Sequence, residues 1–123
     1  MGQFEVILDA MKRRGGDPRP WHEIARAMEL LIAYGRSEGW EGDAKIRRSA
    51  EDATETSWPI LQRYLSVFRR AQAIASKEGL HVDQLLCDGF NGAELAVRLY
   101  DRNRDDGLTA LHDLRHGRQT LAG

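Results

Sequence analysis

The longest amphipathic pattern in the chain covers residues 56–77 and reads TSWPILQRYLSVFRRAQAIASK. At about 100° per residue its apolar side chains cover more than half of the helical circumference, whereas the apolar stripe of an ordinary surface helix is narrower. We therefore expect a helix that is buried on two or three sides. The remaining arc is polar and basic, and it holds Gln62, Arg63, Ser66, Arg69, Arg70, Ala73 and Lys77.

Shorter helical patterns lie on both sides of this segment. Apolar residues three and four positions apart predict helices over residues 4–14, 21–38, 43–54, 91–100 and 108–114, and a brief apolar helix over residues 80–86. The charged run at residues 101–107 is expected to be a connector. No stretch alternates apolar and polar residues as a half-buried strand would. The fold class predicted is all-α, a compact bundle of about six or seven helices.

Capping residues set the expected helix ends. Thr56 or Ser57 is expected to cap the central helix, and Gly79 to end it in a left-handed conformation. Asn91, with Glu94 three residues later, has the spacing of a capping box for the helix that follows. These signals indicate where each helix begins and ends independently of any tertiary contact.

The length of 123 residues is typical of one domain. We therefore expect residues 1–123 to form a single helical domain. Thr120 has the position of an N-cap for a helix that the sequence does not complete, which favours a domain cut from a longer protein. A frayed chain end explains the same residues equally well.

The formal net charge of −1 gives the whole chain no field that would attract nucleic acid or a membrane. Charge is nevertheless segregated, because residues 45–77 hold seven basic residues against three acidic ones, Glu51, Asp52 and Glu55. The single cysteine excludes an intramolecular disulfide and suggests the cytoplasm. The N-terminal residues lack an uninterrupted apolar run, so we expect no signal peptide and no membrane association.

Few residues suggest chemistry. His112 and His116 are four positions apart and would share a helix face, but no further ligand pattern supports a metal site. Cys87 follows two leucines and is expected to be a small core residue rather than a nucleophile. A glycine-rich phosphate loop is also missing from the sequence. We therefore expect no cofactor, no metal and no enzymatic activity.

The arrangement of helix, short turn and helix over residues 43–77 resembles the helix-turn-helix family of DNA-binding domains. In that family the second helix presents its N-terminal side chains to the major groove. The resemblance implies two sets of contacts with duplex DNA. The groove-facing candidates are Thr56, Ser57, Gln62, Arg63 and Ser66. The candidate phosphate contacts are Lys45, Arg47, Arg48, Arg69 and Arg70.

Two functions follow from these observations. The first is a DNA-binding domain of a transcriptional or mobile-element regulatory protein, which contacts duplex DNA through the basic face of residues 56–77. The second is a helical interaction or dimerisation module that binds an acidic partner or a second copy of the chain. The second function would be favoured if Trp40, Trp58 and the C-terminal leucines formed an exposed apolar patch.

Overall fold

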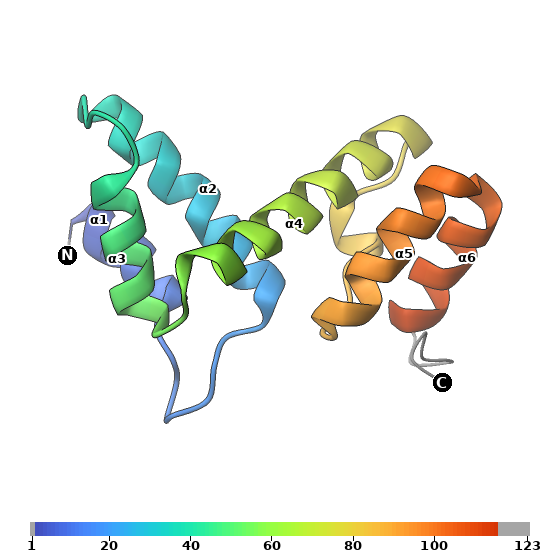
Figure 1. The fold of residues 1–123 in the computed structure, drawn as a ribbon, viewed down its shortest axis with the longest axis horizontal. Coiled ribbons are helices and arrows are strands. Elements are labelled where there is room, and N and C mark those ends of the chain that lie inside the picture. Colours follow the sequence, from blue (N-terminus) through green and yellow to red (C-terminus); the bar gives the residue numbers. More distant parts are fainter. Residues whose placement is uncertain (1, 116–123) are drawn as a thin grey trace. The chain divides into compact units, whose positions relative to one another are not determined.

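A computed structural model describes residues 2–115 of the chain. In this part the chain forms six α-helices and one short 3₁₀ helix, and no strand (Figure 1), so the all-α prediction is confirmed. The elements are α1 (Gln3–Met11), α2 (Trp21–Ser37), α3 (Ala44–Thr54), α4 (Trp58–Glu78), η1 (Val82–Gln84), α5 (Phe90–Arg102) and α6 (Arg104–Arg115).

Contacts divide the chain into two compact units, residues 1–65 and 66–123, and α4 runs across the boundary. A unit defined by contacts is not by itself an independently folding domain. The expectation of one domain over residues 1–123, or of a piece of a longer protein, therefore stays a prediction. Thr120 lies outside the described residues.

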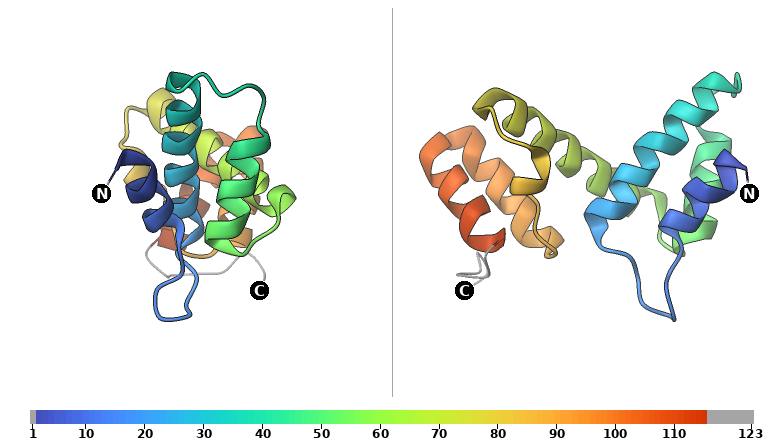
Figure 2. Two further views of the ribbon diagram at one scale, coloured as in Figure 1. Left: turned by 90° about the vertical axis from the view of Figure 1, so that its left-hand side faces the viewer. Right: turned by 180° about the vertical axis from the view of Figure 1, so that it is seen from behind.

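The first unit packs α1, α2, α3 and the first two turns of α4 around one apolar core. Figure 2 shows α1 beside α2 and α3, and their contacts agree with this view. Met28 and Leu31 of α2 are fully buried, as are Met11 of α1, Ala50 of α3 and Leu61 of α4. Fully burying a side chain of leucine or methionine size stabilises a fold by roughly 1.5–3 kcal/mol. Each helix thus contributes to the same core.

Three aromatic side chains close one end of this core. The ring of Phe4 stacks on Tyr34 at a centroid distance of 5.6 Å, and Trp40 meets both rings edge on, at 5.8 and 5.7 Å. The Trp40 N–H donates to the Gly35 carbonyl at 2.9 Å. A Cβ atom at Gly35 would lie 2.9 Å from the Trp40 ring, so a larger residue at this position would push the indole away.

The second unit contains the later turns of α4, then η1, α5 and α6. A single residue, Asn103, separates α5 from α6, and its side-chain carbonyl accepts the N–H of Asp106 at 3.1 Å. The prediction that residues 101–107 form a connector was therefore wrong. The capped turn at Asn103 and a close helix crossing at Gly107 allow both helices to extend into this segment.

Two further expectations for this unit were wrong. The helix α5 begins at Phe90 after the N-cap residue Gly89, so Asn91 and Glu94 do not form the expected capping box. Residues 80–86 form only the 3₁₀ turn η1, which His81 caps by accepting the Asp83 N–H at 3.3 Å. The expected end of α4 is confirmed, because Gly79 has a φ of +70°.

A partly buried residue, Glu78, ties three helices of the second unit together through its carboxylate. The Glu78 side chain is only 8% exposed. It accepts hydrogen bonds from the Tyr100 hydroxyl at 2.6 Å and from Nε of Arg104 at 2.8 and 3.0 Å. The hydrogen bonds from Arg104, and then that from Tyr100, lower the Glu78 pKa to about 2. The end of α4 is thereby attached to the end of α5 and the start of α6.

We predict that Gly107→Ala strongly destabilises the second unit. A Cβ atom at Gly107 would lie 2.3 Å from Cα of Tyr100, which is backbone and cannot rotate away. The helices would have to separate, at a cost of about 3 kcal/mol. The higher helix propensity of alanine returns only about 1 kcal/mol. Chemical unfolding followed by circular dichroism measures the free energy of unfolding of this variant and of the unchanged chain.

Gly89→Ala is the matched control for this prediction. A Cβ atom at Gly89 meets nothing within 4 Å, and the residue has no positive φ. Glycine is preferred over alanine at an N-cap, so its substitution should lower the free energy of unfolding by less than about 1 kcal/mol, clearly less than Gly107→Ala. Equal stability of the two variants would contradict the close crossing of α5 and α6.

Candidate nucleic-acid interface

The turn between α3 and α4 is held by its own side chains. Thr54 is 3% exposed, and its hydroxyl donates to the Ala50 carbonyl at 2.7 Å and accepts the N–H of Thr56 at 3.2 Å. Glu55 has a φ of 54°, the left-handed conformation for which such turns often use glycine. The α3 helix thus ends at Thr54, and the chain reverses within three residues.

The first turn of α4 is capped from α3. One carboxylate oxygen of Glu51 accepts the backbone N–H of Trp58 at 2.9 Å, and the other accepts Nε of Arg47 at 3.3 Å. The Ser57 carbonyl accepts the Leu61 N–H at 3.1 Å, which places Ser57 at the expected start of the helix. A carboxylate near a helix N-terminus is favoured by the helix dipole. Glu51 therefore fixes how α4 leaves the turn.

Two of the three carboxylates near the turn have basic partners. Glu51 pairs with Arg47, and Glu55 lies 3.6 Å from Nε of Arg13. Asp52 is exposed. Ion pairing offsets part of the repulsion that these carboxylates would exert on a phosphate. The pairing of Glu51 also occupies Arg47, one of the predicted phosphate contacts, whereas Arg13 brings a positive charge to the turn from outside residues 45–77.

The predicted basic residues of α3 are all exposed. Nζ of Lys45 lies 5.5 Å from the centroid of the Trp40 ring, and Arg47 is held by Glu51. Arg48 has no ion pair among residues 2–115. A shallow depression along this helix is lined by residues of both charges: Asp43, Ala44, Arg47, Arg48, Glu51 and Asp52.

The polar arc of α4 faces solvent, as the helical pattern predicts. Leu61 and Phe68 are 0% and 1% exposed on the inner side of the helix. The exposed residues on the outer side include Gln62, Arg63, Ser66, Arg69, Arg70, Ala73, Ser76 and Lys77. Ile60 belongs to the apolar arc of the helical pattern, which is expected to be buried, but this residue is 40% exposed. We call the exposed arc from Gln62 to Lys77 the basic ridge.

One arginine of the basic ridge already has an acidic partner. The guanidinium of Arg70 forms an ion pair with the Asp101 carboxylate of α5. The two side chains are 48% and 51% exposed, so solvent and ions reach the pair. Lys77 lies over the ring of Tyr100, with Nζ 5.7 Å from its centroid. The cations of the ridge are thus accessible, and they also have contacts within the protein.

The ten candidate DNA-binding residues divide between the two units. Those of the first unit are Lys45, Arg47, Arg48, Thr56, Ser57, Gln62 and Arg63, and those of the second are Ser66, Arg69 and Arg70. Thr56 is partly buried, and the others are exposed. The Thr56 hydroxyl donates to the Thr54 carbonyl at 3.2 Å. Thr56 therefore helps to shape the turn.

Sequence reasoning missed three residues that shape this surface. In the sequence Glu51 counts only as one of three acidic residues among residues 45–77, and neither Arg13 nor Asp101 is connected with the predicted DNA-binding surface. The spacing of Arg47 and Glu51 at i, i+4 was a detectable signal for their pairing. No local signal links Arg13 to Glu55 or Arg70 to Asp101, because these pairs require the folded arrangement.

The other candidate chemistry finds little support. Among residues 2–115 no three histidine, cysteine or acidic side chains gather as metal ligands. His112 lies 3.5 Å from the Asp113 carboxylate, and His116 lies outside the described residues. Burial raises the Cys87 pKa, and the thiol donates to the Gly89 carbonyl at 3.5 Å. Trp40 and Trp58 are partly buried against the first core rather than exposed.

We predict that Glu51→Ala destabilises the start of α4. The variant leaves the Trp58 N–H without its side-chain acceptor, and loss of a cap costs about 1 kcal/mol. Thermal unfolding should show a lower midpoint than that of the unchanged chain. Asp52→Ala removes the same charge from the neighbouring exposed position and serves as the control. A cap at Glu51 is excluded if both variants unfold at the same temperature.

Comparison with protein-family models, curated proteins and solved structures finds no match. No helix among the described residues combines the length and apolar character needed to cross a bilayer.

Proposed function

We propose that the chain binds duplex DNA through the turn between α3 and α4 and the basic ridge of α4. The observation that carries the proposal is a solvent-exposed helix face without an acidic residue. From Trp58 to Lys77 the sequence has no aspartate or glutamate, and its arginines lie on the exposed side. Phosphate neutralisation by lysine and arginine supplies most of the affinity of proteins for DNA.

The residues at the start of the ridge are suited to reading base edges. Gln62 and Ser66 are exposed one helical turn apart, with Arg63 beside Gln62. A glutamine can form two hydrogen bonds with adenine, and an arginine two with guanine, in the major groove. We assign sequence readout to Gln62 and Arg63, and phosphate contacts to Arg69 and Arg70 further along the helix. Lys45, Arg47 and Arg48 of α3 are additional phosphate contacts of the first unit.

The Glu51 cap supports this function because it limits the directions in which α4 can leave the turn. Base recognition requires that side chains be held near their productive positions. The carboxylate that bonds Trp58 N–H belongs to α3, so the cap joins the two helices directly. An α4 fixed in this way presents its first exposed side chains from a rigid element.

We predict that the double variant R63Q/R69Q weakens DNA binding about tenfold and makes it less dependent on salt. Loss of the phosphate contact of Arg69 should lower the slope of log K against log salt by about 0.9, and loss of the base contact of Arg63 should account for the rest of the lost affinity. Fluorescence anisotropy with a labelled duplex, at salt concentrations from about 50 to 200 mM, measures both quantities. Absence of binding by the unchanged chain at the lowest salt would refute the proposed function.

Arg36→Gln is the matched control for the loss of positive charge. Arg36 is exposed near the end of α2, outside the basic ridge. Its substitution should leave affinity and salt dependence nearly unchanged. If this variant lost as much affinity per charge as R63Q/R69Q, binding would reflect net charge rather than the ridge.

We further predict that Asp101→Asn strengthens DNA binding about two- to fivefold. Asp101 pairs with Arg70 and must release it to a phosphate, and an exposed ion pair is worth up to about 1 kcal/mol. The same titrations measure this gain, and it should vanish when Arg70→Gln is added. Asp106→Asn makes the same charge change at an exposed position and should have a smaller effect. If Asp101→Asn does not raise the affinity for DNA, Arg70 is not one of the phosphate contacts.

A further inference from the structure

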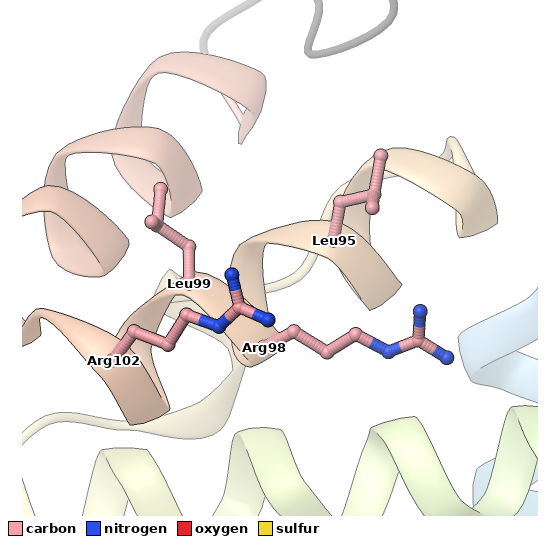
Figure 3. Close-up of a pocket in the computed structure, with 4 residues that line it drawn as sticks. All are labelled: Leu95, Arg98, Leu99 and Arg102. Atoms are coloured by element: carbon pink, nitrogen blue, oxygen red, sulfur yellow. The ribbon is translucent and has the colours of Figure 1, made fainter.

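The α5 helix carries a shallow groove with an apolar edge and a basic edge. Its lining residues are Leu95, Arg98, Leu99 and Arg102, in which the two leucines and the two arginines are each four positions apart along the helix (Figure 3). The groove has a volume of about 370 Å³, and the Leu95 side chain is 43% exposed. Exposed apolar surface beside two arginines is complementary to a partner that carries apolar and acidic side chains.

The two arginines are available for such a partner. Arg98 reaches Glu94 only at 3.9 Å, and its side chain is 68% exposed. Arg102 has no ion pair within residues 2–115. No carboxylate is among the described residues that line the groove. The chemistry of the groove therefore suits an amphipathic segment with acidic residues at i, i+4 spacing and apolar residues next to them.

The outer face of α1 has this chemistry. Glu5 and Asp9 are exposed at i, i+4 spacing, with Val6 and Ala10 exposed beside them. The Val6 side chain is 53% exposed. Neither carboxylate forms an ion pair among the described residues, and Asp9 uses only its backbone carbonyl to accept Nη2 of Arg19. Acidic and apolar edges on α1 thus parallel the basic and apolar edges on α5.

The order of the edges determines how the two faces can pack. At about 100° per residue, the charged edge precedes the apolar edge in the same rotational sense on both helices. When the two helices run in opposite directions, the charged edges of α1 and α5 face each other and so do the apolar edges. In a parallel arrangement the acidic edge of α1 would face the leucines of α5. Only antiparallel packing matches charge with charge and apolar with apolar along the whole contact.

We propose that the α5 groove of one copy of the chain binds α1 of a second copy in an antiparallel orientation. Glu5 faces Arg102 and Asp9 faces Arg98. Val6 and Ala10 of the second copy cover the Leu99 and Leu95 side chains. The two surfaces differ, so the contact is head to tail and leaves one α1 and one α5 groove open for further copies.

The contact involves about two turns of each helix. The surface area that it buries is therefore well below the roughly 1,200 Å² of a stable interface. Self-association should therefore be weak in free solution. It would become effective when neighbouring copies are held close together, because tethering raises their effective concentration. Binding of several copies to one DNA would provide such tethering, and this consequence alone depends on the proposed function.

Sedimentation velocity without DNA tests the contact, at protein concentrations up to about 1 mM because the expected affinity is weak. The unchanged chain should show a mass that rises with concentration. The variants E5K/D9K and R98E/R102E should each remain monomeric. An equimolar mixture of the two should associate again, because each variant supplies the surface that complements the other.

The charge reversal E38K/E41K is the control, since Glu38 and Glu41 are exposed acids outside α1. It should associate like the unchanged chain. Circular dichroism of each variant verifies that the helices are retained, and the rescue in the mixture shows that the single variants have not lost their fold. A monomeric unchanged chain at the highest concentration, or a mixture that fails to associate, would overturn the proposal. A failure of DNA binding would leave it intact.

Discussion

Burial of the apolar side of α4 is the constraint on which the rest of the chain depends. Leu61 and Leu65 belong to the core of the first unit, and Phe68 and Ile74 are buried in the second. A helix whose inner positions are committed to apolar cores has no freedom to turn its outer positions inward. The arginines and polar residues of the basic ridge are exposed because the opposite side is occupied.

A carboxylate stabilises each end of α4, but the interaction that favours its negative charge differs between the two ends. Glu51 binds the N-terminal N–H of Trp58, where the helix dipole favours negative charge. Glu78 lies in the last turn, where the dipole opposes it, and there Arg104 and Tyr100 stabilise its charged form. The second site therefore needs partners from α5 and α6. Because the Glu78 pKa is lowered, its contribution to stability is present at neutral pH and fades as the pH falls from about 4.5 towards 2.

The surface charges differ in how far they are paired within the protein. Arg13 and Arg104 have carboxylate partners that shape a turn or join helices. Arg70 is intermediate, since its partner Asp101 is half exposed and can be displaced. Arg98 and Arg102 lie beside leucines, and Arg98 approaches the Glu94 carboxylate only at 3.9 Å. A count of basic residues does not separate these groups, but their contacts do.

The sequence by itself determined the all-α class, the exposed polar arc of α4 and the end of this helix at Gly79. Periodicity and a left-handed glycine act within a few residues, so they can be read without the fold. The boundaries of α5 and α6, the cap from Glu51 and the pairing of Arg70 with Asp101 were decided only by tertiary structure. Each of them joins residues from different helices, or requires the close approach of Gly107 to Tyr100, and no local pattern contains that information.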